Sequence, residues 1–192
     1  RFDAGEKLVL AICDSARICT TKGTLIFDKK GRRESPHRQD AGSRITCLLQ
    51  MTKGEMEEAL AWTRKLLAPP GILTRVNNVA LETRQPAATL AARLPTEKSN
   101  AAGFLRRVER NTEVKLYETM PGEAAMLYEL GIPIVETGDK WHYDVSQKIP
   151  LTLDREGVAP SFLRDLRLAV FNHVHEQVNA GEMNSPWVEQ VV

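Results

Sequence analysis

The sequence predicts a mixed α+β protein made of two lobes. Its 192 residues are enough to bury a core, and contents of 42% hydrophobic and 27% charged residues are usual for a folded globular chain. Short stretches that alternate between polar and apolar residues, as strands do, are interspersed with segments of helical periodicity. Pro69-Pro70-Gly71 interrupts this pattern. Because paired prolines end a helix and stiffen the chain, we predict domains over residues 1–68 and 69–192.

Charge and hydropathy exclude several broad classes of protein. The net charge of +1 creates no field that would by itself attract nucleic acid, an anionic membrane or an acidic substrate, so such a partner would be bound locally. No apolar run approaches the roughly 18 residues of a membrane span, and we expect a cytoplasmic protein with no membrane contact. Cys13, Cys19 and Cys47 lack the CxxC spacing of a zinc or redox site, and we expect them to be reduced thiols.

The first lobe is predicted to be a small sheet packed on a helix. A glycine turn at Gly5 precedes an apolar segment, residues 6–13, that we expect to form a buried helix. Residues 17–21 and 24–28 alternate around Lys22-Gly23 and predict a hairpin. We expect a polar loop over residues 32–40, followed by a strand inside the sheet over residues 43–50.

A second helix is predicted to close this lobe. Thr52 and Glu55 have the spacing of a capping box, in which each side chain bonds the other residue's backbone N–H. Apolar residues and a threonine then recur at helical intervals along one face: Met56, Leu60, Thr63 and Leu67. We expect the helix to end before Pro69.

The second lobe is predicted to consist mainly of strands with one long helix. Asn77-Asn78 tolerates the positive φ of a tight turn, so residues 72–76 and 79–83 should form a hairpin. Further strands are predicted over residues 88–94, 103–110, 113–118 and 141–145. Residues 123–130 fit either a helix or a strand, and Gly131-Ile132-Pro133 should end that element. The final helix, residues 161–178, carries an apolar stripe of Phe162, Leu166, Val170, Val174 and Val178.

Three local features invite comparison with phosphate-binding sites. Ala4, Gly5, Glu6 and Lys7 stand at a predicted helix start, where free backbone N–H groups favour anions, although one such glycine is more often only a turn. Gln147 and Lys148 lie in a loop that Pro150 keeps out of the sheet, and the alternative for Lys148 is an ordinary surface lysine. Ser43, which opens a strand, could offer a hydroxyl to a ligand.

The order of these features resembles that of the GHKL ATPases, the superfamily of gyrase B, MutL, histidine kinases and the ninety-kilodalton heat-shock chaperone. Arg1-Phe2-Asp3-Ala4-Gly5 before a helix resembles the family's second glycine box. Gly42-Ser43-Arg44-Ile45 resembles the strand that places a hydroxyl near adenine. Residues 128–139, with Gln147-Lys148-Ile149-Pro150-Leu151 and Asp154-Arg155, resemble a bacterial and phage group of ATP-binding GHKL proteins.

The resemblance implies a remnant of a Bergerat-type α/β sandwich followed by a ribosomal-S5-domain-2-like transducer lobe. It further implies an ATP-operated conformational switch in which ATP binding or hydrolysis moves the transducer lobe. Lys148 and Gln147 would serve the γ-phosphate, Ala4 to Lys7 the phosphates, and Ser43 the adenine end. The family's metal-holding acidic-Asn helix and Asp-x-Gly loop precede the glycine box. We therefore expect ATP and Mg²⁺ to bind the complete protein, an ATPase, and the 192-residue chain alone to be inactive.

Other interpretations stay open on the sequence alone. The resemblance to GHKL proteins implies three partners for the chain. These are ATP, a second copy of the chain, and a DNA or protein that binds the transducer lobe. A non-enzymatic alternative is a module that presents Arg106, Arg107 and Arg110 to nucleic acid or protein, as basic clusters do. A third is a dimerisation or scaffold piece. His173 and His175, two apart on a predicted helix, point to different faces and suit no common metal.

Overall fold

The computed structural model describes residues 9–99, 104–152 and 157–175. These residues form a mixed α+β structure, mostly strands in three sheets with few helices, which confirms the predicted class. The chain divides into two compact units, Arg1–Ala59 and Leu60–Val192, and the division falls inside helix α2 (Lys53–Arg64). No helix in the described ranges combines the length and the apolar character needed to cross a membrane.

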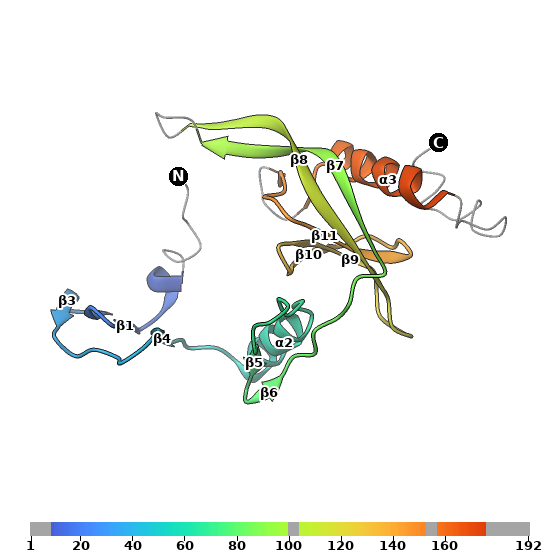
Figure 1. The fold of residues 1–192 in the computed structure, drawn as a ribbon. Coiled ribbons are helices and arrows are strands. Elements are labelled where there is room, and N and C mark those ends of the chain that lie inside the picture. The colour runs from blue at the N-terminus through green and yellow to red at the C-terminus, as the bar shows by residue number, and fades with distance from the viewer. Residues whose placement is uncertain (1–8, 100–103, 153–156, 176–192) are drawn as a thin grey trace. The chain divides into compact units, whose positions relative to one another are not determined.

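The first unit contains an antiparallel sheet of four strands in the order β3-β2-β1-β4. Figure 1 labels β1, β3 and β4 of this sheet. Its strands are β1 (Ser15–Thr20), β2 (Gly23–Asp28), β3 (Gly31–Ser35) and β4 (Ser43–Leu48). The predicted hairpin around Lys22 is confirmed. The predicted polar loop over residues 32–40 is wrong at its start, because β3 pairs with β2 along its whole length. Both faces of this edge strand carry charged residues that face solvent. The strand therefore lacks the alternation of polar and apolar residues that would predict it from the sequence.

Two predictions of burial in the first unit are wrong. β4 pairs only with β1, at the edge of the sheet, and its Ile45 and Leu48 are 68% and 61% exposed. Residues 9–12 are helical, as expected for the segment 6–13, but Ile12 is 68% exposed. Residues 6–8 lie outside the described residues. Apolar composition predicted that these segments form a helix and a strand, but it did not predict that their apolar side chains are exposed.

The capping box that begins α2 is confirmed. The Thr52 N–H donates to Glu55 Oε2 at 2.6 Å, and the Glu55 N–H donates to Thr52 Oγ1 at 3.3 Å. The helix ends at Arg64, earlier than predicted. The Leu67 N–H instead donates to the Gly131 carbonyl at 2.9 Å, which joins the chain after the helix to the sheet of the second unit.

The second unit contains a five-stranded sheet in the order β10-β9-β11-β8-β7. β9 (Met126–Glu129) and β11 (Trp141–Val145) run parallel, and the other neighbours are antiparallel. β7 (Ala88–Ser99) pairs with β8 (Leu105–Glu118), a single strand where the sequence predicted two. β10 (Ile132–Glu136) was not predicted, because Pro133 signals an end. Proline is tolerated here since β10 is an edge strand whose register shifts after Pro133.

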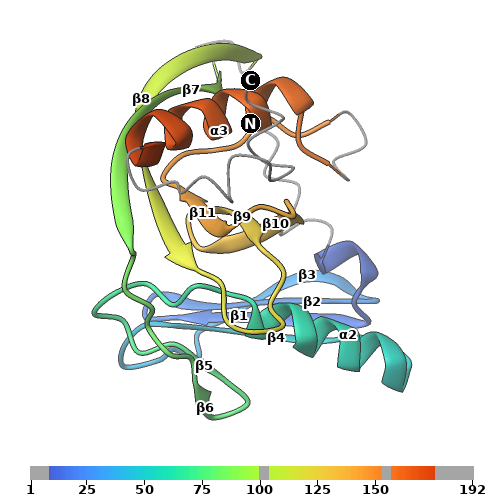
Figure 2. The same cartoon turned by 90° about the vertical axis from the view of Figure 1, so that its right-hand side faces the viewer.

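The core of the second unit lies between this sheet and helix α3 (Pro160–Val174), which crosses one face of it (Figure 2). Phe162, Leu166, Val170 and Val174 are at most 2% exposed, which confirms the predicted stripe as far as it is described; Val178 lies outside the described residues. The sheet contributes Leu94, Val114, Leu116, Tyr143 and Val145 to the same cluster. All five residues of β11 are buried, so both faces of this central strand are covered.

The segment between α2 and β7 is hydrogen-bonded to the second unit's sheet near each of its ends. It contains the predicted Asn77-Asn78 hairpin, formed by β5 (Arg75–Val76) and β6 (Val79–Ala80), with φ values of 48° and 66° at the two asparagines. The Ala87 N–H donates to the Leu116 carbonyl at 2.8 Å. The segment is therefore bonded to the sheet just before β7 begins.

Candidate functional site

The loop that follows β11 presents one lysine outwards between two buried residues. Gln147 is 5% exposed and Ile149 is fully buried. The Lys148 side chain between them is 48% exposed. The loop therefore points its neutral side chains into the protein and its ammonium group towards solvent.

Hydrogen bonds from two neighbouring strands fix the backbone of this loop. Thr96 of β7 donates its hydroxyl to the Lys148 carbonyl at 2.7 Å. The Ile149 N–H donates to Glu129 Oε2 of β9, also at 2.7 Å. The base of the Lys148 side chain is thus held in place, and only the side chain itself remains free to change partners.

The Gln147 amide has a different place from the one predicted. Its Nε2 donates to the Leu94 and Pro95 carbonyls of β7, at 3.2 and 3.3 Å. Its Oε1 is buried and has no hydrogen-bond partner among the described residues. Because Nε2 donates to two carbonyls of β7, the Gln147 side chain anchors the loop, and its contact with a phosphate stays a prediction.

Lys148 Nζ forms an ion pair with Glu97 Oε2 at 3.1 Å. The Glu97 side chain is 26% exposed, so water reaches both partners. Exposed ion pairs of this kind contribute only about 0–1 kcal/mol. An anion of higher charge density could therefore replace Glu97 at small cost.

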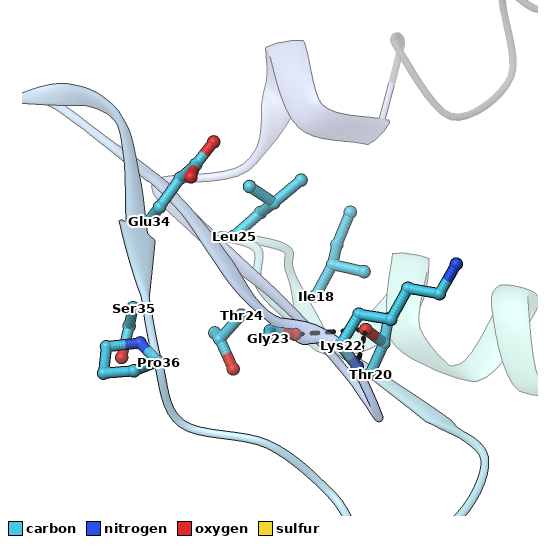
Figure 3. A pocket seen from close by; sticks show the side chains of 9 residues that line it. All are labelled: Ile18, Thr20, Lys22, Gly23, Thr24, Leu25, Glu34, Ser35 and Pro36. Atoms are coloured by element: carbon cyan, nitrogen blue, oxygen red, sulfur yellow. Dashed lines mark hydrogen bonds between the residues drawn. The ribbon is translucent and has the colours of Figure 1, made fainter.

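Ser43 lies in the first unit, near an open pocket of about 490 Å³. The pocket is lined by Ile18, Thr20, Lys22, Gly23, Thr24, Leu25, Glu34, Ser35 and Pro36. Ile18 and Leu25 lie side by side between the charged groups of Lys22 and Glu34 (Figure 3). Ser43 is exposed and is not a lining residue. It pairs with Thr20, however, and therefore shares the sheet face of Ile18 and Thr20.

The predicted site residues are only partly brought together. Gln147 and Lys148 share one loop of the second unit, whereas Ser43 belongs to the first unit. Ala4, Gly5, Glu6 and Lys7 lie outside the described residues.

Sequence reasoning missed a charged cluster on the other face of the second unit's sheet. Arg84 donates from Nη2 to Glu123 Oε1 at 2.8 Å and from Nη1 to Glu123 Oε2 at 2.9 Å. Glu123 Oε2 lies 3.1 Å from His142 Nε2 and also accepts the Met120 N–H at 3.0 Å. His142 is fully buried, and its Nδ1 accepts the Met126 N–H at 3.0 Å. Its proton must therefore be on Nε2, directed at Glu123.

The contacts within this cluster and its burial shift the pKa values of Glu123 and His142. Burial alone would raise the pKa of Glu123, but the Arg84 guanidinium, the Met120 N–H and His142 together lower that pKa to about 2. Burial also lowers the pKa of His142, against the opposing pull of the Glu123 carboxylate. Both shifts favour an ionised Glu123 beside a neutral His142. Because every polar atom of the histidine ring is already bonded, the cluster stabilises the fold and offers no free acid or base.

No local pattern could have revealed these three residues. Arg84 and Glu123 are 39 positions apart, and Arg84 and His142 are 58 apart. Only the pairing of β8 with β11 and the course of the chain before β7 bring them together. The same holds for Glu97, which is 51 positions from Lys148.

Comparisons of the chain with protein-family models, with curated proteins and with solved structures found no match.

Proposed function

We propose that this chain is part of an ATP-binding conformational switch of the GHKL type, in which Lys148 contacts the terminal phosphate of the nucleotide. The observation that carries the proposal is an exposed lysine, on a loop fixed from two strands, whose ion-pair partner is exposed enough to be replaced. The Bergerat-type and S5-domain-2-like assignments of the two lobes belong to the same proposal. They rest on the order of the motifs in the sequence.

A phosphate fits this arrangement better than a neutral ligand does. The lysine ammonium is a compact point charge with three donors, and phosphoryl oxygens are strong acceptors. Because the loop backbone is already fixed, binding an anion orders only the lysine side chain. Negative charge that develops on the γ-phosphate during hydrolysis would be neutralised by the same ammonium group.

Glu97 gives the switch its second state. With no phosphate present, Lys148 is bonded to Glu97 at 3.1 Å. With ATP bound, Lys148 would leave Glu97 for the phosphate, and loss of the phosphate would return it. A ligand shifts a conformational equilibrium only when it binds one state better than the other, and a phosphate would favour the state in which Lys148 has left Glu97.

The sheet face of the first unit that carries Ser43 suits the base of the nucleotide. Ile18 and Leu25 form an apolar surface next to the hydroxyls of Thr20 and Ser43, in a region whose volume of about 490 Å³ is within the range of ligand sites. Among the described residues, no three His, Cys, Asp or Glu side chains group as metal ligands. Mg²⁺ therefore remains an expectation from the resemblance, and we assign no residue to it.

The test compares two substitutions, both made in the full-length protein, that should change its affinity in opposite directions. Lys148→Ala removes the phosphate contact and should weaken the affinity for a non-hydrolysable ATP analogue about 10- to 100-fold, the value of a charge-assisted hydrogen bond. Glu97→Gln frees Lys148 and should strengthen that affinity, by up to about fivefold.

Lys140→Ala is the matched control. Lys140 is an exposed lysine just before β11, at the opposite end of the strand from Lys148, and its ammonium lies 4.7 Å from the centre of the Trp141 ring. Its removal should leave the affinity unchanged. Equal effects of Lys148→Ala and Lys140→Ala, or ATPase activity that survives Lys148→Ala unchanged, would remove the basis of the proposal.

A further inference from the structure

β7 and β8 continue past the rest of their sheet as a two-stranded ribbon, visible in Figure 1. The two strands pair without interruption from Ala88 with Leu116 to Ser99 with Leu105. β11, the other neighbour of β8, pairs only with the last residues of β8, from Val114 to Glu118. Residues 93–99 and 105–111 therefore form a ribbon whose β8 edge has no strand beside it in the described part of the chain.

The pairing register separates the charges of this ribbon by face. Directly paired residues share a face, and successive residues alternate between the two faces. Lys98 pairs with Arg106, and Arg110, four positions further along β8, lies on the same face. Towards the sheet this face continues into the core, because Arg110 pairs with the buried Leu94 and Thr96 is also buried, so its open part consists of the three exposed cations. Arg107 pairs with Glu97 and lies on the other face. The sequence grouped Arg106, Arg107 and Arg110 as one basic cluster, and the structure corrects it to Lys98, Arg106 and Arg110, which we call the basic face.

The acidic residues of the ribbon do not neutralise the basic face. Glu109 is on the other face and forms an ion pair with Arg93 at 2.9 Å. Glu97 forms an ion pair with Lys148. Lys98, Arg106 and Arg110 are exposed, and none of them forms an ion pair with a described residue. Like charges placed directly opposite each other, as in Lys98 and Arg106, destabilise a strand pair. This arrangement lowers stability unless an anion binds there.

We propose that the basic face of the β7–β8 ribbon binds the phosphates of double-stranded DNA. A two-stranded ribbon fits the major groove of B-form DNA, which is about 12 Å wide, but not the deep, narrow major groove of duplex RNA. Arg110 is four positions after Arg106 in β8, a distance of about 14 Å at the usual rise. That distance is close to the roughly 12 Å width of the major groove, so the two cations would reach phosphates at its two edges where the strands cross it.

This inference does not depend on nucleotide binding, so the 192-residue chain can be tested directly. Binding to a fluorescently labelled DNA duplex is followed by anisotropy from 50 to 200 mM salt. Three phosphate contacts predict a slope of about −2.7 for the logarithm of the affinity against that of the salt concentration. Lys98→Gln with Arg106→Gln should weaken binding about tenfold at low salt and reduce the slope to about −0.9.

The matched control removes two cations from the opposite face. Arg93→Gln with Arg107→Gln changes the net charge by the same amount, and it should leave affinity and slope close to those of the unmodified chain. Thermal unfolding of both variants establishes that they are folded. Equal loss in the two double variants would show attraction by overall charge and overturn the proposal. Absence of binding at 50 mM salt would do the same, as would equal binding of duplex RNA or of a single strand.

Discussion

Replacing Glu123 with glutamine tests whether the partly buried charge cluster of Arg84, Glu123 and His142 stabilises the second unit. Its carboxylate is 26% exposed and is bonded to Arg84, Met120 and His142. A fall of its pKa from the ordinary 4.5 to about 2 corresponds to about 3 kcal/mol of stability. Glutamine removes the charge and leaves the Arg84 guanidinium, only 25% exposed, without a carboxylate. We expect Glu123→Gln to lower the free energy of unfolding at pH 7 by about 2–3 kcal/mol.

The stabilisation that Glu123 provides should depend on pH in a known direction. A carboxyl group whose pKa is lowered by folding stabilises the protein above its unfolded pKa, and the contribution is lost as the pH falls towards the folded value. The difference between the unmodified protein and Glu123→Gln should therefore be full above pH 4.5 and should shrink between pH 4.5 and about 2. Urea unfolding, followed by near-ultraviolet circular dichroism, measures it at each pH.

Glu136→Gln is the control for this experiment. Glu136 is 57% exposed and pairs with Lys65 at 3.1 Å at the surface, so its loss should change stability by less than about 1 kcal/mol. If Glu123→Gln and Glu136→Gln had the same effect, or if the effect of Glu123→Gln did not vary with pH, the reasoning about the buried cluster would be refuted.

Two further substitutions test the packing of the second unit. Gly131→Ala should destabilise it by more than about 2 kcal/mol, because φ there is +81° and a Cβ would lie 2.8 Å from the Leu67 carbonyl oxygen. Gly138→Ala, with φ of +70° but open space around the Cβ, should cost only about 1 kcal/mol; equal thermal shifts would count against the predicted clash. Arg167→Met removes the partner 2.9 Å from the buried Asp139 carboxylate. This substitution should lower the free energy of unfolding by about 3–5 kcal/mol. Adding Asp139→Asn should recover part of that loss, which unfolding of the double variant measures.

Local signals predicted the turns, the amphipathic helix and the strands of ordinary pattern. Asn77 and Asn78 have the positive φ that a tight turn needs, and the apolar stripe of α3 follows the helical period because one face is buried. The capping box before α2 depends only on residues three apart. Each of these features is fixed by neighbours in the sequence, so it could be predicted without knowing the fold.

What could not be predicted depends on contacts between distant residues. β3 and β10 carry charges or proline, as edge strands can, and their pairing partners are what make them strands. Ile45 and Ile12 looked like core residues but are 68% exposed. For the candidate site, sequence reasoning selected Lys148, but it missed Glu97, and it expected the Gln147 amide to face a ligand. The direction of that side chain follows from the Leu94 and Pro95 carbonyls that it meets across the sheet.

The central claim is that Lys148 distinguishes a nucleotide that has a terminal phosphate from one that has lost it. The most direct test is calorimetry of a non-hydrolysable ATP analogue and of ADP, with the full-length protein and with its Lys148→Ala variant. We expect the variant to bind ADP normally and to lose about 10- to 100-fold of its preference for the ATP analogue. An unchanged preference in the variant would show that Lys148 does not contact the terminal phosphate.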